Sequence, residues 1–312
     1  MFSYFLSILA NLPQQYETLD ANRITIIHFC LFGVSTEASL SEILDRPPSE
    51  LADTIYELQS PFGGFYPSWT VNSILLESFD PSLTNIAMTY SALASLTLLG
   101  DDLSRVNRVS LVTHLQLLQQ HNGSVSCSVG SESDLRFVYC ACITMHLTDT
   151  WTALNLDSMT DFILRCYNID GGFSSVPNGE SHAGSTFCAI ASLYLLEKLH
   201  HLAEPQKRRS VRFLHLLQRQ GFHGRISKED DTCYTYWVLA SLHLLSPETL
   251  PLIDLKTLEA FIDACTNTLK GGCKVIAKNP DIFPDPMHAC LGLNGIRIAS
   301  RCSDIDKAVF LI

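Results

Sequence analysis

The sequence predicts an all-α fold in which paired helices form a closed double ring. Short glycine breaks recur along the chain, and from Gly123 through Gly171, Gly221 and Gly271 they come at about 50-residue intervals. Between these breaks, very apolar segments alternate with amphipathic ones. A repeat of this length, with two helices and one glycine-rich connection, is typical of stacked helical hairpins.

Each repeat should contribute an apolar helix and an amphipathic partner. The predicted pairs are 86–100 with 110–120, 136–147 with 159–167, 185–199 with 208–220, and 233–245 with 255–269, before a last apolar helix at 288–299. The apolar set would form an inner ring and the amphipathic set an outer ring; an open solenoid of the same pairs is the alternative. Because the inner helices start just after the glycine-rich turns, their N-termini would open together, which suits an anionic ligand.

The N-terminal stretch MFSYFLSILANL is expected to form a first helix. It lacks the basic region and cleavage site of a signal peptide, and it is too short to span a bilayer. No other stretch reaches transmembrane length.

Composition narrows the class of protein. The 312 residues, 46% of them hydrophobic and 17% charged, can build a large core, and we expect a single domain over residues 1–312. The net charge of -11 argues against nucleic acid as the main ligand. The 11 cysteines are odd in number and form no Cys-x-x-Cys pair, which fits reduced thiols in the cytoplasm.

Three potential metal ligands stand at predicted starts of inner helices: Asp231, Cys233 and His288. A carboxylate, a thiolate and an imidazole would give zinc three protein ligands and leave the fourth position open, as catalytic zinc sites require. However, an Asp before a helix is most often an N-cap, and a lone Cys is most often part of the core. Spacing alone does not choose between these interpretations.

Cations gather near the same helix starts, at His182, Arg225 and Lys228. Cations at helix N-termini are unfavourable unless an anion is present, so they indicate an anion site, with a solvated loop as the alternative. Aromatic side chains lie nearby, at Tyr139, Phe187, Tyr234, Tyr236 and Trp237. They could pack in the core or line an apolar tunnel. An anion clamp, a tunnel and a thiol-binding metal together describe transfer of a long hydrocarbon from a diphosphate to a thiol.

Over nearly its whole length the sequence resembles the β subunit of protein prenyltransferases. The segments that carry the resemblance are GRISKEDDTCYTYW, ESHAGSTFCAIASL and PDPMHA. Two further segments, AMTYSALASLTLLGDDLSRVNR and SESDLRFVYCACI, are closer to the type I geranylgeranyl branch than to the farnesyl or Rab enzymes. The resemblance implies an α/α toroid, a catalytic zinc, geranylgeranyl diphosphate as donor, and an α subunit as obligate partner. The acceptor would be a protein ending in Cys-a-a-Leu or Cys-a-a-Phe.

The resemblance also implies roles for individual residues. Asp231, Cys233 and His288 would bind zinc; His182, Arg225, Lys228 and Tyr234 would bind the diphosphate; Arg136, Tyr139, Gly184, Cys188 and Trp237 would line the isoprenoid channel. Lys278, ten residues before His288, would replace Mg²⁺ at the diphosphate, so that Mg²⁺ is not required. Thr25 would leave room at the far end of the channel, where the farnesyl enzyme has Trp.

The sequence departs from the type I pattern in a few places. The segment between Gly272 and His288 is longer, and Met287, Ala21 and Asn85 replace other residues. These departures leave the peptide selectivity open. The competing interpretations are a farnesyl- or Rab-type subunit, a non-catalytic scaffold with the same fold, and a terpene-cyclase-like toroid, for which the D-x-D-D motif is missing.

Overall fold

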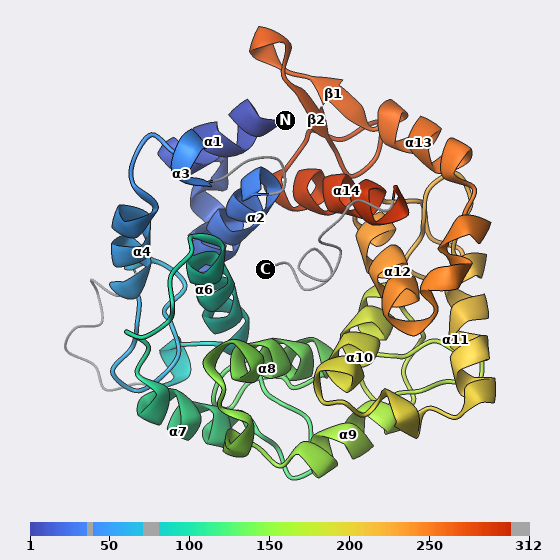
Figure 1. The fold of residues 1–312 in the computed structure, drawn as a ribbon, viewed down its shortest axis with the longest axis horizontal. Coiled ribbons are helices and arrows are strands. Elements are labelled where there is room, and N and C mark those ends of the chain that lie inside the picture. Colours follow the sequence, from blue (N-terminus) through green and yellow to red (C-terminus); the bar gives the residue numbers. More distant parts are fainter. Residues whose placement is uncertain (36–39, 71–80, 301–312) are drawn as a thin grey trace. The chain divides into compact units, whose positions relative to one another are not determined.

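The computed structural model describes residues 1–35, 40–70 and 81–300 (Figure 1). The chain divides into two compact units, one from Phe2 to Met159 and one from Thr160 onward. We call them the N-terminal unit and the C-terminal unit. The single domain expected for residues 1–312 stays a prediction.

The N-terminal unit is built around three apolar helices, α2 (Arg23–Ser35), α6 (Ile86–Leu98) and α8 (Leu135–Thr148). Helix α6 packs against both α2 and α8. The other helical elements are α1 (Phe2–Ala10), η1 (Gln14–Asn22), α3 (Leu40–Ile43), α4 (Pro48–Tyr56), η2 (Pro81–Leu83), α7 (Arg108–Leu118) and η3 (Trp151–Ala153). Helix α1 confirms the first helix predicted from the sequence.

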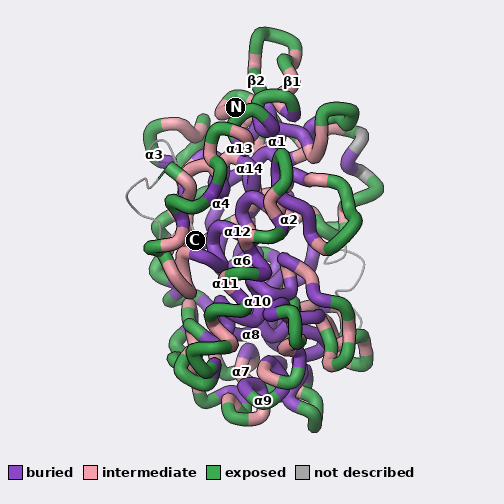
Figure 2. Tube along the Cα trace, turned by 90° about the vertical axis from the view of Figure 1, so that its right-hand side faces the viewer, coloured by how far each residue is buried: buried purple, intermediate pink, exposed green. Residues whose placement is uncertain are grey.

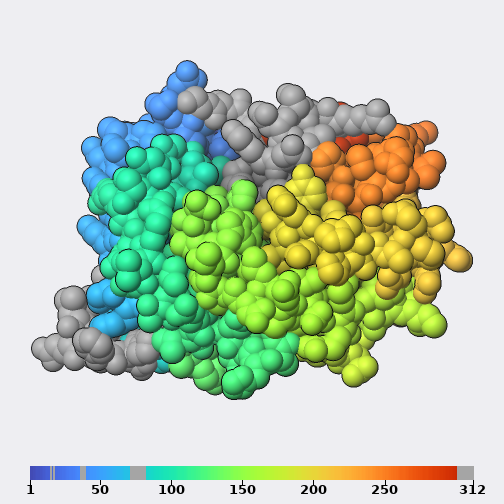
Figure 3. Space-filling model, turned by 60° about the horizontal axis from the view of Figure 1, so that its bottom comes forward, coloured from blue at the N-terminus to red at the C-terminus, as the bar shows by residue number. Residues whose placement is uncertain are grey.

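The C-terminal unit repeats this plan with α10 (Ala183–Leu195), α12 (Thr232–Leu245) and α14 (Pro286–Ala299), where α12 packs between the other two. Helices α11 (Glu204–Leu216) and α13 (Leu255–Ala264) cover them, and their regions adjoin on the surface, in yellow and orange (Figure 3). The remaining elements are η4 (Leu199–His201), η5 (Pro247–Leu252), β1 (Thr266–Thr268), η6 (Lys270–Gly272) and β2 (Lys274–Ile276), while α9 (Leu156–Arg165) spans the sequence boundary between the units.

The two layers differ in burial, as the sequence predicts. In α6 every residue from Met88 to Leu96 is buried, so this stretch has no solvent-exposed face. In α11 the buried residues are Ser210, Phe213 and Leu214, which lie on one stripe. Figure 2 shows this contrast as purple stretches in the apolar helices and green stretches at the surface. Among the described residues, no helix is long and apolar enough to cross a membrane.

Three predicted helices are too long at their C-terminal ends. Those over 185–199 and 208–220 end at Leu195 and Leu216, and the third differs most. The sequence indicated a helix over 255–269, but α13 ends at Ala264 and the chain turns into β1, which pairs antiparallel with β2. The segment Thr266-Asn267-Thr268 consists of poor helix formers, and threonine favours strands. The hairpin therefore follows from local preferences that the apolar periodicity had concealed.

Each of these apolar helices from α6 onward begins with a polar side chain that caps its backbone. The caps and the N–H groups that they accept from are Asn85 (Met88), Asp134 (Arg136), His182 (Gly184), Asp231 (Cys233) and Asp285 (His288). A helix N-terminus leaves four N–H groups without helical partners, and these side chains satisfy some of them. Capping therefore places polar groups at the helix ends where the candidate site residues lie.

Glutamine side chains fasten neighbouring covering helices. Gln119, at the end of α7, accepts from the Asn155 N–H (2.9 Å) and donates to the Asn155 carbonyl (3.0 Å), just before α9. Gln218, after α11, makes the same pair of bonds with Asp254 before α13, at 3.0 and 2.9 Å. These bonds recur with the repeat and fix the spacing of the outer layer without using side chains from the core.

A buried histidine in the N-terminal unit makes stability depend on pH. His114 of α7 is 0% exposed, and burial lowers its pKa from 6.5 to about 4. It covers the turn at Gly63 and Gly64, where an added Cβ would lie 2.7 Å and 3.3 Å from His114 atoms. The folded protein therefore holds this imidazole neutral in a space that has little room for water.

We predict that His114 contributes to acid unfolding. Since its pKa is lower in the folded state, the unfolded chain binds more protons below pH 6.5, and stability falls as the pH drops from 6.5 to about 4. The full loss should be about 3 kcal/mol. The free energy of unfolding of His114→Gln, measured with urea, should vary less over this pH range than that of the wild type. His121→Gln, at an exposed histidine, is the control; equal pH profiles for wild type and His114→Gln would contradict the prediction.

Candidate metal centre and anion site

The C-terminal unit brings together the three predicted metal ligands. Asp231, Cys233 and His288 are all buried, and one ligand atom from each lies within 4.8 Å of the others. Asp231 caps α12, Cys233 lies in its first turn, and His288 lies in the first turn of α14. Asp231 is therefore both an N-cap and a potential ligand, so the two interpretations of the sequence are compatible. This cluster could hold a metal ion.

Close packing of α12 on α14 brings these two helix starts together. At Gly295 of α14, an added Cβ would lie 2.7 Å from Thr235 Cγ2 and 2.8 Å from the Tyr236 backbone nitrogen. Any larger residue there would push the helices apart. At the start of α12, Thr232 donates from its backbone N–H to Lys278 O (3.0 Å) and from its hydroxyl to Ala277 O (2.9 Å). The chain that leads into α14 is thus tied to α12.

His288 lies between two carboxylates. Its Nδ1 is 2.5 Å from Asp285 Oδ2, and its Nε2 is 3.4 Å from Asp231 Oδ1. Burial lowers the pKa of His288, but the hydrogen bonds and charges of Asp231 and Asp285 outweigh burial and raise it to about 9. A carboxylate on Nδ1 fixes the imidazole ring with Nε2 toward the cluster, which is a common support for metal-binding histidines.

The thiol of Cys233 needs a cation in order to ionise. Burial and the neighbouring Asp231 carboxylate raise its pKa well above the usual value. Burial raises the pKa of Asp231, but hydrogen bonds from His288 and Cys233 outweigh it and lower that pKa. A buried thiol and carboxylate in contact therefore provide two groups whose anionic forms a divalent cation would stabilise.

Lys278 reaches the edge of this cluster. Its Nζ lies 3.7 Å from Asp231 Oδ2, and its side chain is 45% exposed. The ammonium is therefore beside the candidate metal ligands and open to solvent on the other side, where a ligand could meet it.

The predicted anion clamp adjoins the cluster through α12, because Tyr234 follows Cys233. His182 caps α10 with Nδ1, which accepts from the Gly184 N–H (3.1 Å), and its Nε2 lies 3.1 Å from the Tyr234 hydroxyl. Burial and then Arg225 lower the pKa of His182, so the ring is neutral near pH 7. With Nδ1 accepting, we assign the proton to Nε2, which donates to the Tyr234 oxygen and leaves the phenol proton available to an anion.

The two loop cations are placed differently. Arg225 forms an ion pair with Glu180, with Nη1 and Oε2 2.5 Å apart and its side chain 41% exposed. Lys228 is exposed in the same loop. The pairing of Arg225 with Glu180 was not expected from the sequence, because 45 residues separate them.

The expected channel residues of this unit occupy the two helices beside the clamp. Gly184 begins α10, Cys188 is 8% exposed one turn later, and Trp237 lies in the first turns of α12. Phe187 and Tyr236, at 0% exposure, pack against Trp237 in tilted and edge-on arrangements, with ring centroids 5.0 Å and 4.9 Å from it. For Phe187 and Tyr236 the core interpretation is therefore correct.

The other expected channel residues lie in the N-terminal unit. Arg136 forms an ion pair with Asp134 (2.6 Å), and Tyr139, 4% exposed, meets the Tyr90 ring edge-on at 5.8 Å. Thr25 of α2 faces α6, where its hydroxyl lies 3.0 Å from Ser91 Oγ. Their roles in a channel stay predictions.

Two of the residues that depart from the type I pattern lie at helix starts. Asn85 caps α6, and Met287 lies between the α14 cap and His288. Sequence reasoning missed Asp285, although an Asp before a Pro at a helix start is a recognisable cap signal. It also missed Glu180 and Gly224, which no local pattern reveals.

Comparison with known proteins identifies the class. The model of the prenyltransferase alpha-alpha toroid domain matches residues 1–310, so the chain belongs to this family and its fold is the predicted α/α toroid. Within the family, it is a protein prenyltransferase β subunit. The geranylgeranyl transferase type-1 subunit beta of Arabidopsis thaliana is 33% identical, over 87% of this chain and 78% of its own length.

A second sequence relative and a solved structure belong to the same class. The geranylgeranyl transferase type-1 subunit beta of Dictyostelium discoideum is 32% identical, over 94% of this chain and 88% of its own length. The solved structure of Candida albicans protein geranylgeranyltransferase-I complexed with GGPP superposes with a TM-score of 0.83 at 28% identity, covering 95% of this chain and 89% of that chain.

We predict that Gly224 positions Tyr234. A Cβ at residue 224 would lie 2.3 Å from Tyr234 Cζ, so Gly224→Ala should turn the ring away from His182. The Tyr234 hydroxyl would then no longer be available to the anion, and the affinity for inorganic pyrophosphate should fall about tenfold. Calorimetry of Gly224→Ala, Tyr234→Phe and the double variant measures this. The double variant should lose no more than Tyr234→Phe alone; fully additive losses would show that Gly224 acts elsewhere.

Proposed function

We propose that this chain is the catalytic β subunit of a type I protein geranylgeranyltransferase. It would transfer geranylgeranyl from geranylgeranyl diphosphate to the cysteine of proteins ending in Cys-a-a-Leu or Cys-a-a-Phe. One observation carries the proposal: consecutive residues at the start of α12 would serve both sites, since Cys233 lies in the candidate metal cluster and Tyr234 contacts His182 of the expected anion clamp. A thiol-binding centre directly beside a diphosphate-binding centre is what prenyl transfer to cysteine requires.

Zinc is the metal that the donor set fits best. Carboxylate, thiolate and imidazole ligands are typical of zinc, and three protein ligands leave one position for the substrate sulfur. The support of His288 by Asp285, at 2.5 Å, is of the kind found around bound zinc. Asp231, Cys233 and His288 would hold the ion.

The residues around the cluster would act on the leaving diphosphate. When bound, zinc supplies the charge that keeps the substrate cysteine as a thiolate at neutral pH. With the thiol proton released to solvent, the sulfur would attack C1 of the isoprenoid; as the S–C bond formed, the C1–O bond would break and diphosphate would leave. The Tyr234 hydroxyl, held by His182, would donate a hydrogen bond to the developing charge. Arg225, Lys228 and Lys278 would neutralise it, which lowers the barrier because the charge grows in the transition state.

A chain of this family is expected to work with an α subunit, and the relatives are themselves named as subunits. We propose a heterodimer that acts in the cytoplasm. A farnesyl-transferring enzyme is the second candidate, because the farnesyltransferase subunit beta of Schizosaccharomyces pombe is also a relative, at 29% identity. The deciding experiment is to co-express the chain with an α subunit and measure transfer of both prenyl groups to Cys-a-a-Leu and Cys-a-a-Ser peptides. Farnesyl transfer to Cys-a-a-Ser as the fastest reaction would overturn the type I assignment.

We predict one zinc ion per chain in the heterodimer. Cys233→Ala should lose most of the zinc and the transfer activity, because it removes one of the three ligands. Elemental analysis after dialysis measures the metal, and Cys142→Ala, at a buried cysteine of α8, is the control. Zinc content in Cys233→Ala equal to that of the control would rule out this site.

We predict that Mg²⁺ is not required. Lys278, 3.7 Å from Asp231, places a fixed positive charge where a diphosphate would meet the cluster. The wild-type rate should not change with millimolar Mg²⁺, whereas Lys278→Asp should be slow without Mg²⁺ and recover with it. Lys274→Asp, at the exposed start of β2, is the control. A wild-type rate that rises many-fold with Mg²⁺ would count against the role of Lys278.

We predict that Thr25 sets the preferred prenyl length. A Trp at this position would need the space between α2 and α6 that Thr25 shares with Ser91 and Met88. Overpacking costs about 1–3 kcal/mol, so Thr25→Trp should shift the preference toward farnesyl diphosphate roughly tenfold or more. The ratio of kcat/KM for the two diphosphates is the measurement. Thr25→Ser should keep the wild-type ratio; an unchanged ratio in Thr25→Trp would place the end of the channel elsewhere.

A further inference from the structure

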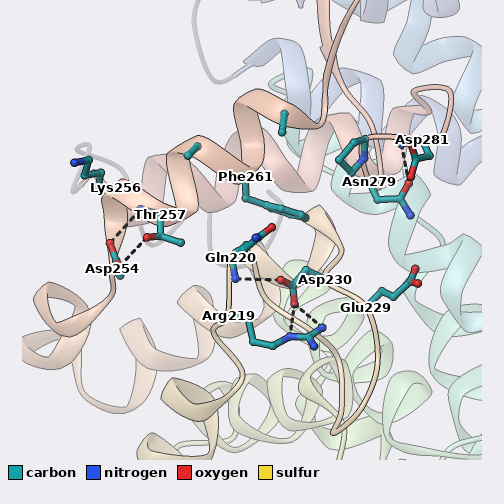
Figure 4. A pocket seen from close by; sticks show the side chains of 13 residues that line it. Arg219, Gln220, Glu229, Asp230, Asp254, Lys256, Thr257, Phe261, Asn279 and Asp281 are labelled. Carbon is teal, nitrogen blue, oxygen red and sulfur yellow. Dashed lines mark hydrogen bonds and ion pairs between the residues drawn. The ribbon is translucent and has the colours of Figure 1, made fainter.

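A carboxylate that the proposed mechanism does not use precedes the metal ligand Asp231 in the chain. The Asp230 side chain, 10% exposed, contacts Arg219 and the turn amides of Gln220 and Gly221, and it lines a cavity of about 740 Å³. Figure 4 shows it joined to Arg219 and Gln220. Adjacent carboxylates therefore serve different neighbours.

Three residues donate hydrogen bonds to the Asp230 carboxylate, and a buried histidine lies near it. Oδ2 accepts from the backbone N–H groups of Gln220 (3.2 Å) and Gly221 (3.0 Å), and Oδ1 accepts from Arg219 Nε (3.2 Å). His223 Nδ1 lies 3.5 Å away. Burying a charge is costly unless it is paired and hydrogen-bonded, so this set of donors explains why the carboxylate can lie here.

Arg219 extends the contact to the far side of the loop. Besides Asp230, its Nη2 donates to the Lys228 carbonyl oxygen. The guanidinium thus holds both residues that flank Glu229 against the end of α11. We call Arg219, Asp230 and the amides of Gln220 and Gly221 the loop latch.

The latch closes the loop that carries the two candidate diphosphate cations. A backbone hydrogen bond from the Asp231 N–H to Phe222 O (2.9 Å) joins the two ends of this loop, and Arg225 and Lys228 lie between them. Within it, Lys228 N–H bonds to Arg225 O (3.2 Å) in a turn where Ser227 has a φ of 64°. Arg225 also pairs with Glu180, and the Ala183 N–H donates to Gly224 O (2.8 Å). The left-handed serine is unfavourable unless its neighbours are held.

We propose that Asp230 is a positioning residue for diphosphate binding. Through Arg219 and the turn amides, it holds the loop that carries Arg225 and Lys228 in one arrangement, in which Gly224 of the same loop packs against Tyr234. Without the latch, each binding event has to order the loop, and that entropy cost weakens binding of the anion. This inference rests on the proposed function for its substrate, but the contacts themselves do not.

The kinetic test uses the heterodimer and the variants Asp230→Asn and Arg219→Gln. Each should raise KM for the prenyl diphosphate and the inhibition constant of inorganic pyrophosphate by about tenfold, the effect of one charge-assisted contact. KM for the peptide and the zinc content should stay unchanged. The double variant should be no worse than Asp230→Asn, since both changes open one latch. Glu229→Gln, the exposed neighbour with the same charge change, should behave like the wild type.

Other outcomes would overturn the proposal. The proposal fails if KM for the diphosphate is unchanged in both single variants. It also fails if KM rises equally for the diphosphate and the peptide, or if the two increases add in the double variant. Each of these results would show that Asp230 serves only the fold. Arg219 is 54% exposed, so Arg219→Gln should fold even if Asp230→Asn does not.

A second measurement separates this inference from the proposed function. Hydrogen exchange of the heterodimer, followed by mass spectrometry, should show faster exchange of residues 220–231 in Asp230→Asn but not in Glu229→Gln. If the wild-type heterodimer transfers no prenyl group but this exchange difference is still observed, the proposed function is rejected and the latch is kept. Unchanged exchange in Asp230→Asn would reject the latch itself.

Discussion

The contact between α12 and α14 is the constraint on which the rest of the site depends. An added Cβ at Gly295 would lie within 2.8 Å of the α12 backbone, so only glycine allows this approach. The approach sets His288 beside Asp231 and Cys233, and the Thr232 bonds bring Lys278 to the same edge. A metal centre made of residues from two helices needs such a contact, because ligand distances tolerate little variation.

The start of α12 combines two opposite electrostatic demands. The cluster of Asp231, Cys233 and Asp285 favours a cation, whereas the N-terminus of a helix and the loop cations favour an anion. In the proposed prenyl transfer both would arrive together: the metal would bind the thiol, and the diphosphate would meet Tyr234, Lys228 and Lys278. The raised pKa of Cys233 and the lowered pKa of His182 show that the protein environment by itself favours the neutral form of each group.

Carboxylates divide the work around this centre. Asp231 faces the cluster, Asp285 orients His288, Glu180 pairs with Arg225, and Asp230 holds the loop. The net charge of -11 thus conceals a local arrangement in which buried or paired acids keep the cations in place. Such supporting residues often matter as much as the ligands, since they set orientation and affinity.

The sequence by itself determined the repeat, the two helical layers and the residue types at the helix starts, because periodicity and capping are local properties. It also singled out Asp231, Cys233 and His288, although it could not decide between cap, core and ligand. Only the tertiary structure decided that Asp231 can be both cap and ligand, while Asp230, one residue earlier, turns to Arg219. The sequence likewise did not predict that Arg225 pairs with Glu180 or that Tyr234 packs against Gly224. These contacts join residues far apart in the chain, and packing of whole helices, rather than any local pattern, selects them.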